Sequence, residues 1–536
     1  MIGTYQELTK KNFLNELEAM DKDKLKAYMD AMYWTDPSEE DEEKKSRPVV
    51  RLAITANLFE ELTSDCLRYN TTTKTFWNYD EGKWSDLKTN KVTTPVQNFG
   101  NALKEFGEKH PEFKKAFVKI GIQVGGVPKA INDVSSMVVN SSNGNFSSED
   151  LDQLDSLINF KNGCFDLDQL KMVPQKPEHL LSKQCNVEYD PTATCPRFKL
   201  FIEQITVNEH GTPQPEKVAY LQMFLGLCLT ANMDNEFFHI FYGATTRNGK
   251  TTLANAVTGI LGSYAAYIPA DSLDSKTKVQ PNAPRPDLAS IAGARVVIVG
   301  EPKKDMKLDA SLIKQITGKS PIPVRRLNEA TFQLRCQCKM ILDSNYLPKV
   351  TDETLFTSNR IRIIPFEKHF ETSEQDPLLE KKLEAEKSGI LNWMIEGLKK
   401  YRAQVGTHAE LLPTIECMKD YADTYEDEFR RVETFVNAVI EENGIGTYTT
   451  NIETNYNCIK ARDLYDYYKG WCKDEAYIPM GFSKFKEELV KSFGKKGYYK
   501  QAYPVIDGTQ KHFRDVFVGY TYKKDAAFYL NVTARY

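Results

Sequence analysis

The amino-acid sequence predicts an α/β protein whose parallel sheet carries a phosphate-binding loop. The run 237–242 is apolar and aromatic, as a buried strand is, and it breaks at Gly243 into a short polar loop. That loop leads through Gly249 and Lys250 into a helical pattern. A second run, 294–299, is continuously apolar, which is typical of strands buried on both faces of a parallel sheet. Strand, loop and helix in this order favour a nucleotide-binding core.

Three domains are expected along the chain. An α+β accessory domain is expected over residues 1–190, and the parallel-sheet core with helical flanks over residues 191–410. Residues 411–536 form charged helices and then a helix–helix–hairpin order that predicts a winged helix. A chain of 536 residues has room for such a division.

Composition excludes several classes of protein. The net charge is −4, so any binding of nucleic acid must come from local basic groups. No apolar run is long enough to span a bilayer, and the N-terminus has the pattern of a charged amphipathic helix. The ten cysteines are scattered, and the close pair Cys336 and Cys338 has neither zinc-site nor disulfide spacing. These features predict a protein of the host cytoplasm with reduced thiols and no membrane partner.

Several elements are expected before the phosphate-binding loop. Aromatic residues around an Asp-Glu-Gly turn predict a hairpin over residues 75–84. Its Trp77 and Trp84 are candidates for stacking on bases, although hairpin aromatics more often belong to a core. A second strand–turn–strand is expected at 157–167. Helices are expected at 50–62, 94–108, 112–124, from Pro196, and at 217–229.

The loop itself has the chemistry of a triphosphate site. Backbone N–H groups and a helix N-terminus attract phosphate oxygens, Lys250 suits the β- and γ-phosphates, and the Thr251 hydroxyl suits Mg²⁺. Counted back from Lys250, the usual first glycine is Ala244, so either the loop is one residue longer or it turns on an alanine. The predicted nucleotide-binding residues are Gly243, Thr246, Arg247, Asn248, Gly249, Lys250, Thr251 and Thr252.

Glu301 follows the apolar run 294–299 and is the candidate for polarising the attacking water. The carboxyl ends of parallel strands meet beside the phosphate-binding loop, which is where such a carboxylate is needed. The preceding residue is Gly300 rather than a second acid. Thr251 and Glu301 are therefore the predicted Mg²⁺ ligands, with Asp305 as a distant alternative.

Downstream strands supply two more polar candidates. Asn345 follows the apolar run 339–342 and suits a sensor that hydrogen-bonds the γ-phosphate and the water. Before it, two alternating runs, 321–327 and 330–342, predict a hairpin around residues 328–329. Arg325 and Arg326 lie near its tip and are candidates for contacts to DNA phosphates.

An arginine at the entry to the last apolar strand suits an arginine finger, which reaches the γ-phosphate in a neighbouring subunit. Arg360 is the predicted finger, with Arg362 as the alternative, because both lie at this strand. In the C-terminal domain, basic residues interleave with Tyr498 and Tyr499, which suggests a nucleic-acid surface. The candidates there are Lys484, Lys495 and Lys496.

The order Lys250, Glu301, Asn345 and Arg360 resembles that of superfamily 3 helicases. The strings ITGKSPIPVRRL, DSNYLPKV and NRIRIIPF resemble motifs of the helicase part of phage and plasmid primase-helicases, relatives of the poxvirus primase-helicase. The resemblance runs from about residue 50 to the end. Ser320 departs from it where an acidic residue is common, and Asn359 where the first of two arginines is common.

The resemblance implies an AAA+ core and an ATP- and Mg²⁺-dependent replicative DNA helicase of a phage, plasmid or integrated element. Such an enzyme forms a ring, expected to be a homo-hexamer, translocates 3′ to 5′ on single-stranded DNA and unwinds forked duplex. A separate primase or polymerase is an expected partner, because no primase-like pair of carboxylates occurs in the N-terminal region. The alternatives are an origin-binding initiator ATPase with weak unwinding, and a DNA-packaging or other nucleotide-binding protein.

Overall fold

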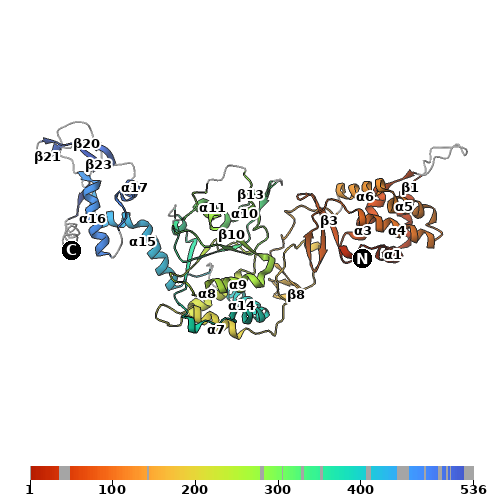
Figure 1. Ribbon diagram of the computed structural model, residues 1–536, viewed down its shortest axis with the longest axis horizontal. Helices are drawn as coiled ribbons and strands as arrows, with labels where there is room; N and C mark the ends of the chain where they lie inside the picture. Colours follow the sequence, from red (N-terminus) through yellow and green to blue (C-terminus); the bar gives the residue numbers. More distant parts are fainter. Residues whose placement is uncertain are drawn as a thin grey trace. The chain divides into compact units, whose positions relative to one another are not determined.

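The computed structural model divides the chain into two compact units, Met1–Lys419 and Asp420–Tyr536. Figure 1 traces their elements. The three domains expected from the sequence stay a prediction. The structure describes residues 2–34, 49–141, 144–277, 283–304, 306–327, 331–350, 354–405, 412–442, 458–475, 479–492, 498–502, 505–506, 509–518 and 520–523.

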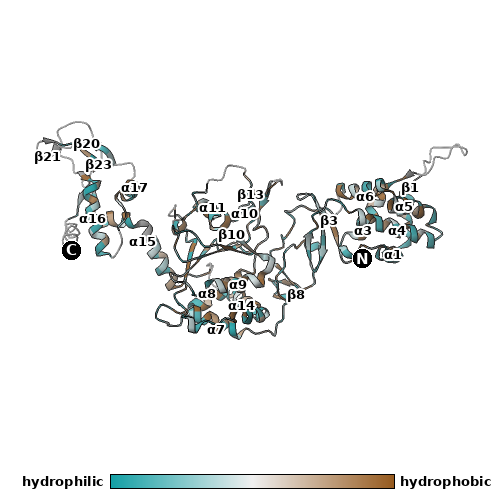
Figure 2. Ribbon diagram, in the orientation of Figure 1, coloured by the Kyte–Doolittle hydropathy of each residue, from teal (hydrophilic) through white to brown (hydrophobic). Residues whose placement is uncertain are grey.

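The first unit begins with a small helical bundle. Its elements are α1 (Lys10–Ala19), α2 (Lys22–Met32), β1 (Tyr33–Trp34), β2 (Val49–Val50), α3 (Leu52–Thr63), α4 (Thr93–Lys109), α5 (Lys114–Gly126) and α6 (Pro128–Asn140). The rings of Phe13, Phe59 and Phe99 meet at its centre, with centroids 5.5–5.8 Å apart. In Figure 2 these helices carry apolar and polar residues side by side, as helices with one buried face do.

Two three-stranded antiparallel sheets follow the bundle. The first holds the predicted aromatic hairpin, and it comprises β3 (Leu67–Asn70), β4 (Thr75–Asp80) and β5 (Lys83–Asp86). Trp84 is buried and its indole N–H donates to the Pro177 carbonyl at 2.8 Å, which makes it a core residue. The second sheet comprises β6 (Leu157–Phe160), β7 (Gly163–Asp166) and β8 (Lys171–Val173).

A five-stranded, fully parallel sheet forms the centre of the first unit, as the sequence predicts (Figure 1). Its order is β10 (Ala265–Ile268), β11 (Val296–Val299), β15 (Lys339–Ser344), β9 (Phe238–Tyr242) and β17 (Ile361–Pro365). All four residues of β11 and all five of β17 are buried. The carboxyl ends of these strands therefore lie along one edge and their amino ends along the other.

Helices cover both faces of this sheet (Figure 1). Val296 and Ile298 pack into the core that also contains side chains of α8 and α9, whereas the alternate residue Val297 faces the other side. The helices are α7 (Pro196–Ile205), α8 (Pro215–Leu227), α9 (Lys250–Leu261), α10 (Pro286–Ala289), α11 (Ala310–Thr317), α12 (Thr354–Thr357), α13 (Leu379–Ala385) and α14 (Lys387–Val405). Side chains of β6 and β7 share the α8–α9 core, although they precede residue 190.

The predicted hairpin forms, but the run 330–342 is not one strand. β13 (Ile322–Arg325) pairs antiparallel with β14 (Thr331–Leu334), and β15 then starts a separate strand of the central sheet at Lys339. A further parallel pair joins β12 (Lys307–Leu308) to β16 (Lys349–Val350). Both strands contain buried apolar residues, so the apolar and polar alternation of the sequence does not show where β14 ends and β15 begins.

The second unit has its own core, in which the rings of Tyr468 and Phe485 stack with centroids 4.5 Å apart. The long helix α15 (Glu416–Val439) leads into it. Its described elements are β18 (Ile440–Glu442), β19 (Cys458–Lys460), α16 (Ala461–Asp474), α17 (Phe482–Ser492), β20 (Tyr498–Ala502), β21 (Val505–Ile506), β22 (Thr509–Gln510), β23 (Phe513–Val518) and β24 (Tyr520–Tyr522). The sheet order β19-β23-β20 is antiparallel.

Two expectations from composition concern the whole chain. Among the residues that the structure describes, no helix is long and apolar enough to cross a membrane. Nine of the ten cysteines have described side chains; these are free thiols, and Cys417 alone among them is not buried.

Candidate functional site

The loop between β9 and α9 turns at Gly243, which is the longer of the two arrangements that the sequence allows. A Cβ on Gly243 would lie 2.1 Å from Asn248 Nδ2 and 2.8 Å from the Phe366 carbonyl oxygen, so only glycine fits. Ala244 is exposed. Gly249 closes the loop with φ +85°, a conformation that glycine adopts without strain.

Three successive carbonyl groups of this loop have partners, one from within the loop and two from the segment after β17. Thr245 O accepts from Asn248 Nδ2 at 2.6 Å, Arg247 O accepts from the Phe370 N–H at 2.9 Å, and Thr246 O lies 2.8 Å from His369 Nδ1. In a planar trans peptide the N–H points opposite to the C=O. The N–H groups that follow these carbonyls therefore point to the other side, and within the described residues no acceptor takes them. This arrangement suits an anion.

Lys250 begins α9 and its side chain is buried against the carboxyl edge of the sheet. Its Nζ donates to Asn345 Oδ1 at 2.9 Å and to Asn248 Oδ1 at 3.2 Å, and it lies 3.8 Å from Asp343 Oδ1. Burial lowers the pKa of Lys250, while Asp343 and Glu301 oppose that shift. The ammonium thus has only neutral amides at hydrogen-bond distance among the described residues, and a phosphate oxygen would be a stronger partner.

Asn345 connects Lys250 to Glu301. While its Oδ1 accepts from Lys250, its Nδ2 donates to Glu301 Oε1 at 3.0 Å. Glu301 follows β11 and is exposed, and Asn345 follows β15, the adjacent strand. The structure therefore brings three of the four predicted catalytic residues into one hydrogen-bonded chain.

Asp343 belongs to this cluster and was not among the predicted residues. Its Oδ2 accepts from the Thr251 hydroxyl at 2.8 Å. Burial is the largest influence on this carboxyl and raises its pKa, whereas the Thr251 hydrogen bond and Lys250 act in the opposite direction. The sequence carried a signal for it, because Asp343 directly follows the apolar run 340–342, two residues before Asn345.

The oxygen atoms around Thr251 suit a hard cation. Thr251, Asp343 and Glu301 offer a hydroxyl and two carboxylates, the ligands that Mg²⁺ prefers, and no soft sulfur or imidazole is among them. Within the described part of the chain no group of three or more His, Cys, Asp or Glu side chains could hold a metal by itself. The fit is therefore to a cation that takes its other ligands from phosphate and water. Asp305, the alternative ligand considered from the sequence, lies outside the described residues.

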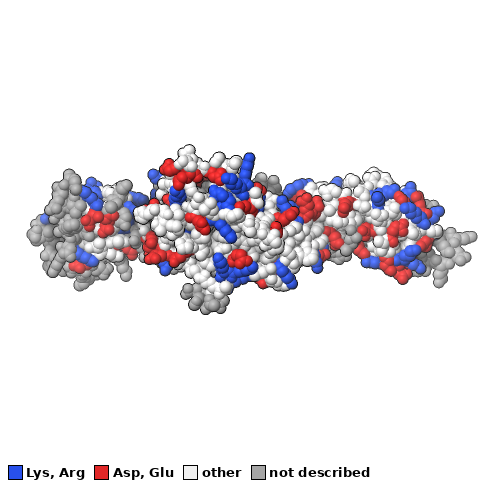
Figure 3. All heavy atoms as spheres, turned by 90° about the horizontal axis from the view of Figure 1, so that it is seen from below, with Lys and Arg blue, Asp and Glu red and all other residues white. Residues whose placement is uncertain are grey.

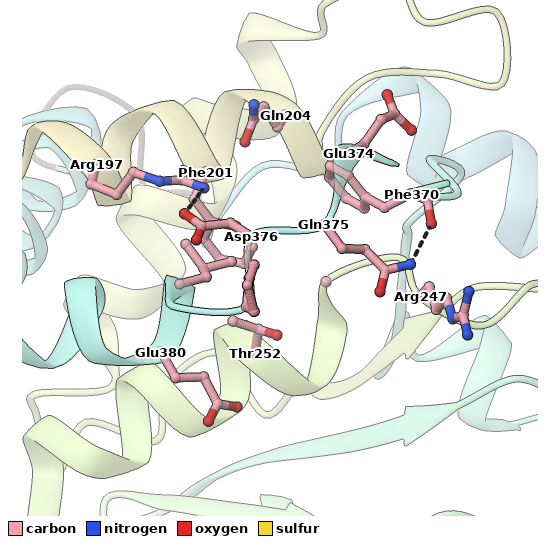
Figure 4. Close-up of a pocket in the computed structure, with 13 residues that line it drawn as sticks. Arg197, Phe201, Gln204, Arg247, Thr252, Phe370, Glu374, Gln375, Asp376 and Glu380 are labelled. Atoms are coloured by element: carbon pink, nitrogen blue, oxygen red, sulfur yellow. Dashed lines mark hydrogen bonds and ion pairs between the residues drawn. The ribbon is translucent and has the colours of Figure 1, made fainter. Parts of the chain in front are cut away.

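A pocket of about 340 Å³ opens beside the loop (Figure 4). Phe201 and Arg197 reach it from α7, Arg247 and Thr252 from the loop and α9, and Phe370 from the segment after β17. Arg197 Nη2 lies 3.6 Å from Asp376, while its buried Nη1 has no hydrogen-bond partner among the described residues. A pocket lined by aromatic rings and polar side chains suits a flat, polar-edged ligand such as a nucleobase.

The fourth predicted catalytic residue lies elsewhere. Arg360 precedes β17 and so lies at the amino edge of the sheet, where its Nη1 donates to Thr317 Oγ1 at 2.7 Å and its Nη2 pairs with Glu236 at 2.5 Å. The alternative, Arg362, is buried within the sheet with its guanidinium 4.1 Å from the centre of the Phe237 ring. Arg362 cannot reach another molecule from there.

The predicted DNA-contacting residues have mixed placements. Arg325 and Arg326 are half-buried, and the guanidinium of Arg326 lies 4.9 Å from the centre of the Phe332 ring of the same hairpin. Lys484 is exposed on α17. Lys495 and Lys496, like the hairpin tip at 328–330, lie outside the described residues.

Two family models match the chain. One is described as "D5 N terminal like" and matches residues 56–207. The other is a family of unknown function (DUF5906) and matches residues 241–360. The second match begins in β9 and ends at Arg360, so it contains all four predicted catalytic residues.

Viral proteins match as well. A protein of Acanthamoeba polyphaga mimivirus named "Putative helicase L207/L206" is 26% identical over 349 residues, which are 60% of this chain and 33% of that protein. A protein of Frog virus 3 (isolate Goorha) named "Putative helicase 022R" is 29% identical over 137 residues, which are 25% of this chain and 14% of that protein. The chain thus spans about a third of the length of the mimivirus relative.

The resemblance to primase-helicases of superfamily 3 is confirmed. It rests on the match to the D5 N-terminal model and on the viral relatives together. Among solved structures, the apo NrS-1 C terminal region is 13% identical with a TM-score of 0.44, and the match covers 84% of this chain and 96% of that one.

Proposed function

We propose that this chain is the motor of an ATP- and Mg²⁺-dependent DNA helicase of superfamily 3 and that it works as a ring. One observation carries the proposal: Lys250, Asn345 and Glu301 form a hydrogen-bonded chain beside a loop whose backbone N–H groups at residues 246–248 have no acceptor among the described residues. Names of the viral relatives agree with a helicase. Replication in a phage, plasmid or integrated element is the setting that the resemblance implies.

Each residue of the cluster has a distinct task in ATP hydrolysis. The loop N–H groups and Lys250 bind the phosphates, and Lys250 exchanges Asn345 for phosphate oxygen as it does so. Glu301 orients and deprotonates the attacking water, and Asn345 holds Glu301 in place through the 3.0 Å hydrogen bond. Thr251 and Asp343 would hold Mg²⁺, which neutralises charge on the phosphates when it is bound. Removing Lys250 should therefore abolish hydrolysis.

The pocket beside the loop would take the nucleoside. Phe201 and Phe370 line it and would pack against the base. Since the pocket adjoins Gly249 and Thr252, a base bound there leaves the phosphates over the loop. ATP is the triphosphate that the resemblance implies.

The position of Arg360 supports the proposed ring. Arg360 and the phosphate-binding loop lie at opposite edges of one sheet, so a neighbour would supply the arginine, and head-to-tail contacts form a ring when the rotation between neighbours closes. Six copies are expected. The AAA+ core would comprise residues 191–410, with an accessory domain before it and a winged helix after it. The resemblance implies that the chain translocates 3′ to 5′.

DNA contact would come from local groups. Figure 3 shows acidic and basic side chains interspersed on the face in view, without a large field of one sign. The β13–β14 hairpin with Arg325 and Arg326 would follow one strand, and the basic C-terminal residues would hold the fork. Binding should therefore fall steeply with salt and depend little on base sequence. Partners such as a primase or polymerase belong to the same proposal.

Strand displacement on forked DNA tests the proposed function. ATP-dependent release of the displaced strand from a fork with a 3′ tail, lost in Lys250→Ala, is the expected result. ATP hydrolysis and origin binding without displacement would instead favour the initiator. If DNA-stimulated hydrolysis persists in Lys250→Ala, the site assignment itself is wrong.

A further inference from the structure

Arg360 is held at two points at the amino edge of the sheet. Its Nη2 pairs with Glu236, which lies two residues before β9 begins. Its Nη1 donates to the Thr317 hydroxyl. The Arg360 side chain is 17% exposed and that of Glu236 is 39% exposed. The guanidinium is therefore oriented by this chain, while part of the Arg360 side chain stays exposed.

The backbone at this position is fixed as well. Arg360 N donates to Leu355 O at 3.1 Å, and Arg360 O accepts from Phe238 N at 2.7 Å. With its main chain tied to α12 and β9, the arginine can change only its side-chain torsions. Glu236 and Thr317 therefore decide which way the guanidinium points.

We infer that Glu236 and Thr317 position Arg360 for the nucleotide of a second copy of this chain and link it to the β13–β14 hairpin. This inference rests on the proposed function. A guanidinium has five N–H donors in a fixed fork, so two of them can be used for positioning while others meet a phosphate. Fixing the fork beforehand reduces the entropy lost when the phosphate is bound.

The link to the hairpin runs through α11. Thr317 ends this helix, its own hydroxyl donates to Ile313 O at 2.7 Å, and residues 318–321 lead straight into β13. Two further contacts fasten the same region: Lys319 pairs with Asp234 at 2.5 Å, and Lys314 contacts Thr354 of α12. A displacement of Arg360 toward a neighbour's phosphate thus pulls on the helix that carries the hairpin.

Steady-state ATP hydrolysis by the full chain, with and without single-stranded DNA, tests both parts. For Glu236→Gln we expect kcat to fall about 5- to 100-fold with KM within about twofold, because the arginine acts on the transition state. For Thr317→Val we expect the stimulation by DNA to fall about fivefold or more. Thr317→Ser, which keeps the hydroxyl, should restore the stimulation.

Controls separate this inference from the proposed function. Glu236 is exposed enough that Glu236→Gln should keep the wild-type Tm, and Arg360→Ala should abolish hydrolysis. If Arg360→Ala abolishes hydrolysis but Glu236→Gln has wild-type kcat, or raises KM instead, the positioning role is wrong and the proposed function stands. Full DNA stimulation in Thr317→Val would overturn the link to the hairpin. If Arg360→Ala itself retains hydrolysis, the proposed shared site fails, and with it this inference.

Discussion

The two edges of the central sheet hold the two halves of the nucleotide site that we propose. At the carboxyl edge, Lys250, Asn345 and Glu301 contact one another beside the loop. At the amino edge, Arg360 contacts Glu236 and Thr317. The five residues of β9 separate them by roughly 15 Å, more than an arginine side chain spans. One chain therefore has both halves and cannot join them.

The difference also lies in how the cations are satisfied. Lys250 has lowered pKa through burial and only amide oxygens as hydrogen-bond partners among the described residues, so it is ready to take a phosphate. Arg360 already has a carboxylate and a hydroxyl. Lys250 can therefore bind a phosphate of its own chain's nucleotide, as the proposed binding group must. Arg360 is oriented in advance by its two partners, as the proposed arginine finger must be.

Lys250→Ala should have the largest effect, at least about 100-fold on kcat for ATP hydrolysis, because it removes the buried cation that begins α9 at the end of the loop. Colorimetric phosphate release measures it. Lys161→Ala, an exposed lysine on the β6–β7 turn, is the matched control and should be unchanged. Equal rates in the two variants would break the distinction between the edges.

Asp343→Asn should reduce hydrolysis about 10- to 100-fold at limiting Mg²⁺, with partial recovery at high Mg²⁺. Because burial raises the pKa of Asp343 in the chain without a bound cation, kcat/KM measured at limiting Mg²⁺ should fall on acidification at a higher pH than an ordinary aspartate would give. The carboxylate is needed ionised, so activity is present above that pKa and lost below it. A pH–rate profile checks this, and an unchanged acid limb in Asp343→Asn would contradict it.

Phe370→Ala should raise KM for ATP about three- to tenfold with little change in kcat, because the ring contributes to nucleoside binding and not to the transition state. Leu200→Ala on α7 is the control, since Leu200 is exposed and Phe201 lines the pocket. A fall in kcat at constant KM would contradict the assignment of the nucleoside to this pocket.

Arg362→Met should have the smallest effect, within about twofold on hydrolysis, because Arg362 is buried and its guanidinium packs on the Phe237 ring. Its Nε and Nη1 have no hydrogen-bond partners among the described residues, so an apolar side chain of similar length should leave Tm unchanged or higher. Differential scanning calorimetry measures Tm. Loss of hydrolysis in a stable Arg362→Met protein would indicate that Arg362, and not Arg360, is the arginine finger.

The sequence predicted those parts of the fold that local pattern determines. Strand β9, the loop, helix α9 and the carboxyl-edge residues Glu301 and Asn345 follow from apolar runs that end in polar side chains. The parallel sheet follows from runs buried on both faces. The split between β14 and β15 was missed because Arg335–Cys338, which join the two strands and belong to neither, continue the alternating pattern.

The remaining features depend on contacts between distant segments. Asp343 was missed because a carboxylate inside a strand gains a role only once Thr251 lies 2.8 Å away. His369 and Phe370 fix the loop carbonyls from a segment more distant in sequence than any local rule reaches. The partners of Arg360 lie far from it in the chain, so no spacing predicted Glu236 or Thr317.

Mixing two inactive variants tests the central claim that the site is shared between copies. Lys250→Ala retains Arg360, and Arg360→Ala retains Lys250, so a mixed ring contains interfaces where both groups are intact. The account predicts that the two proteins, each inactive alone, together recover up to about a quarter of the wild-type ATP hydrolysis at equal amounts, if subunits mix at random and act independently. No recovery in a mixture shown by native mass spectrometry to contain both variants in one ring would contradict it.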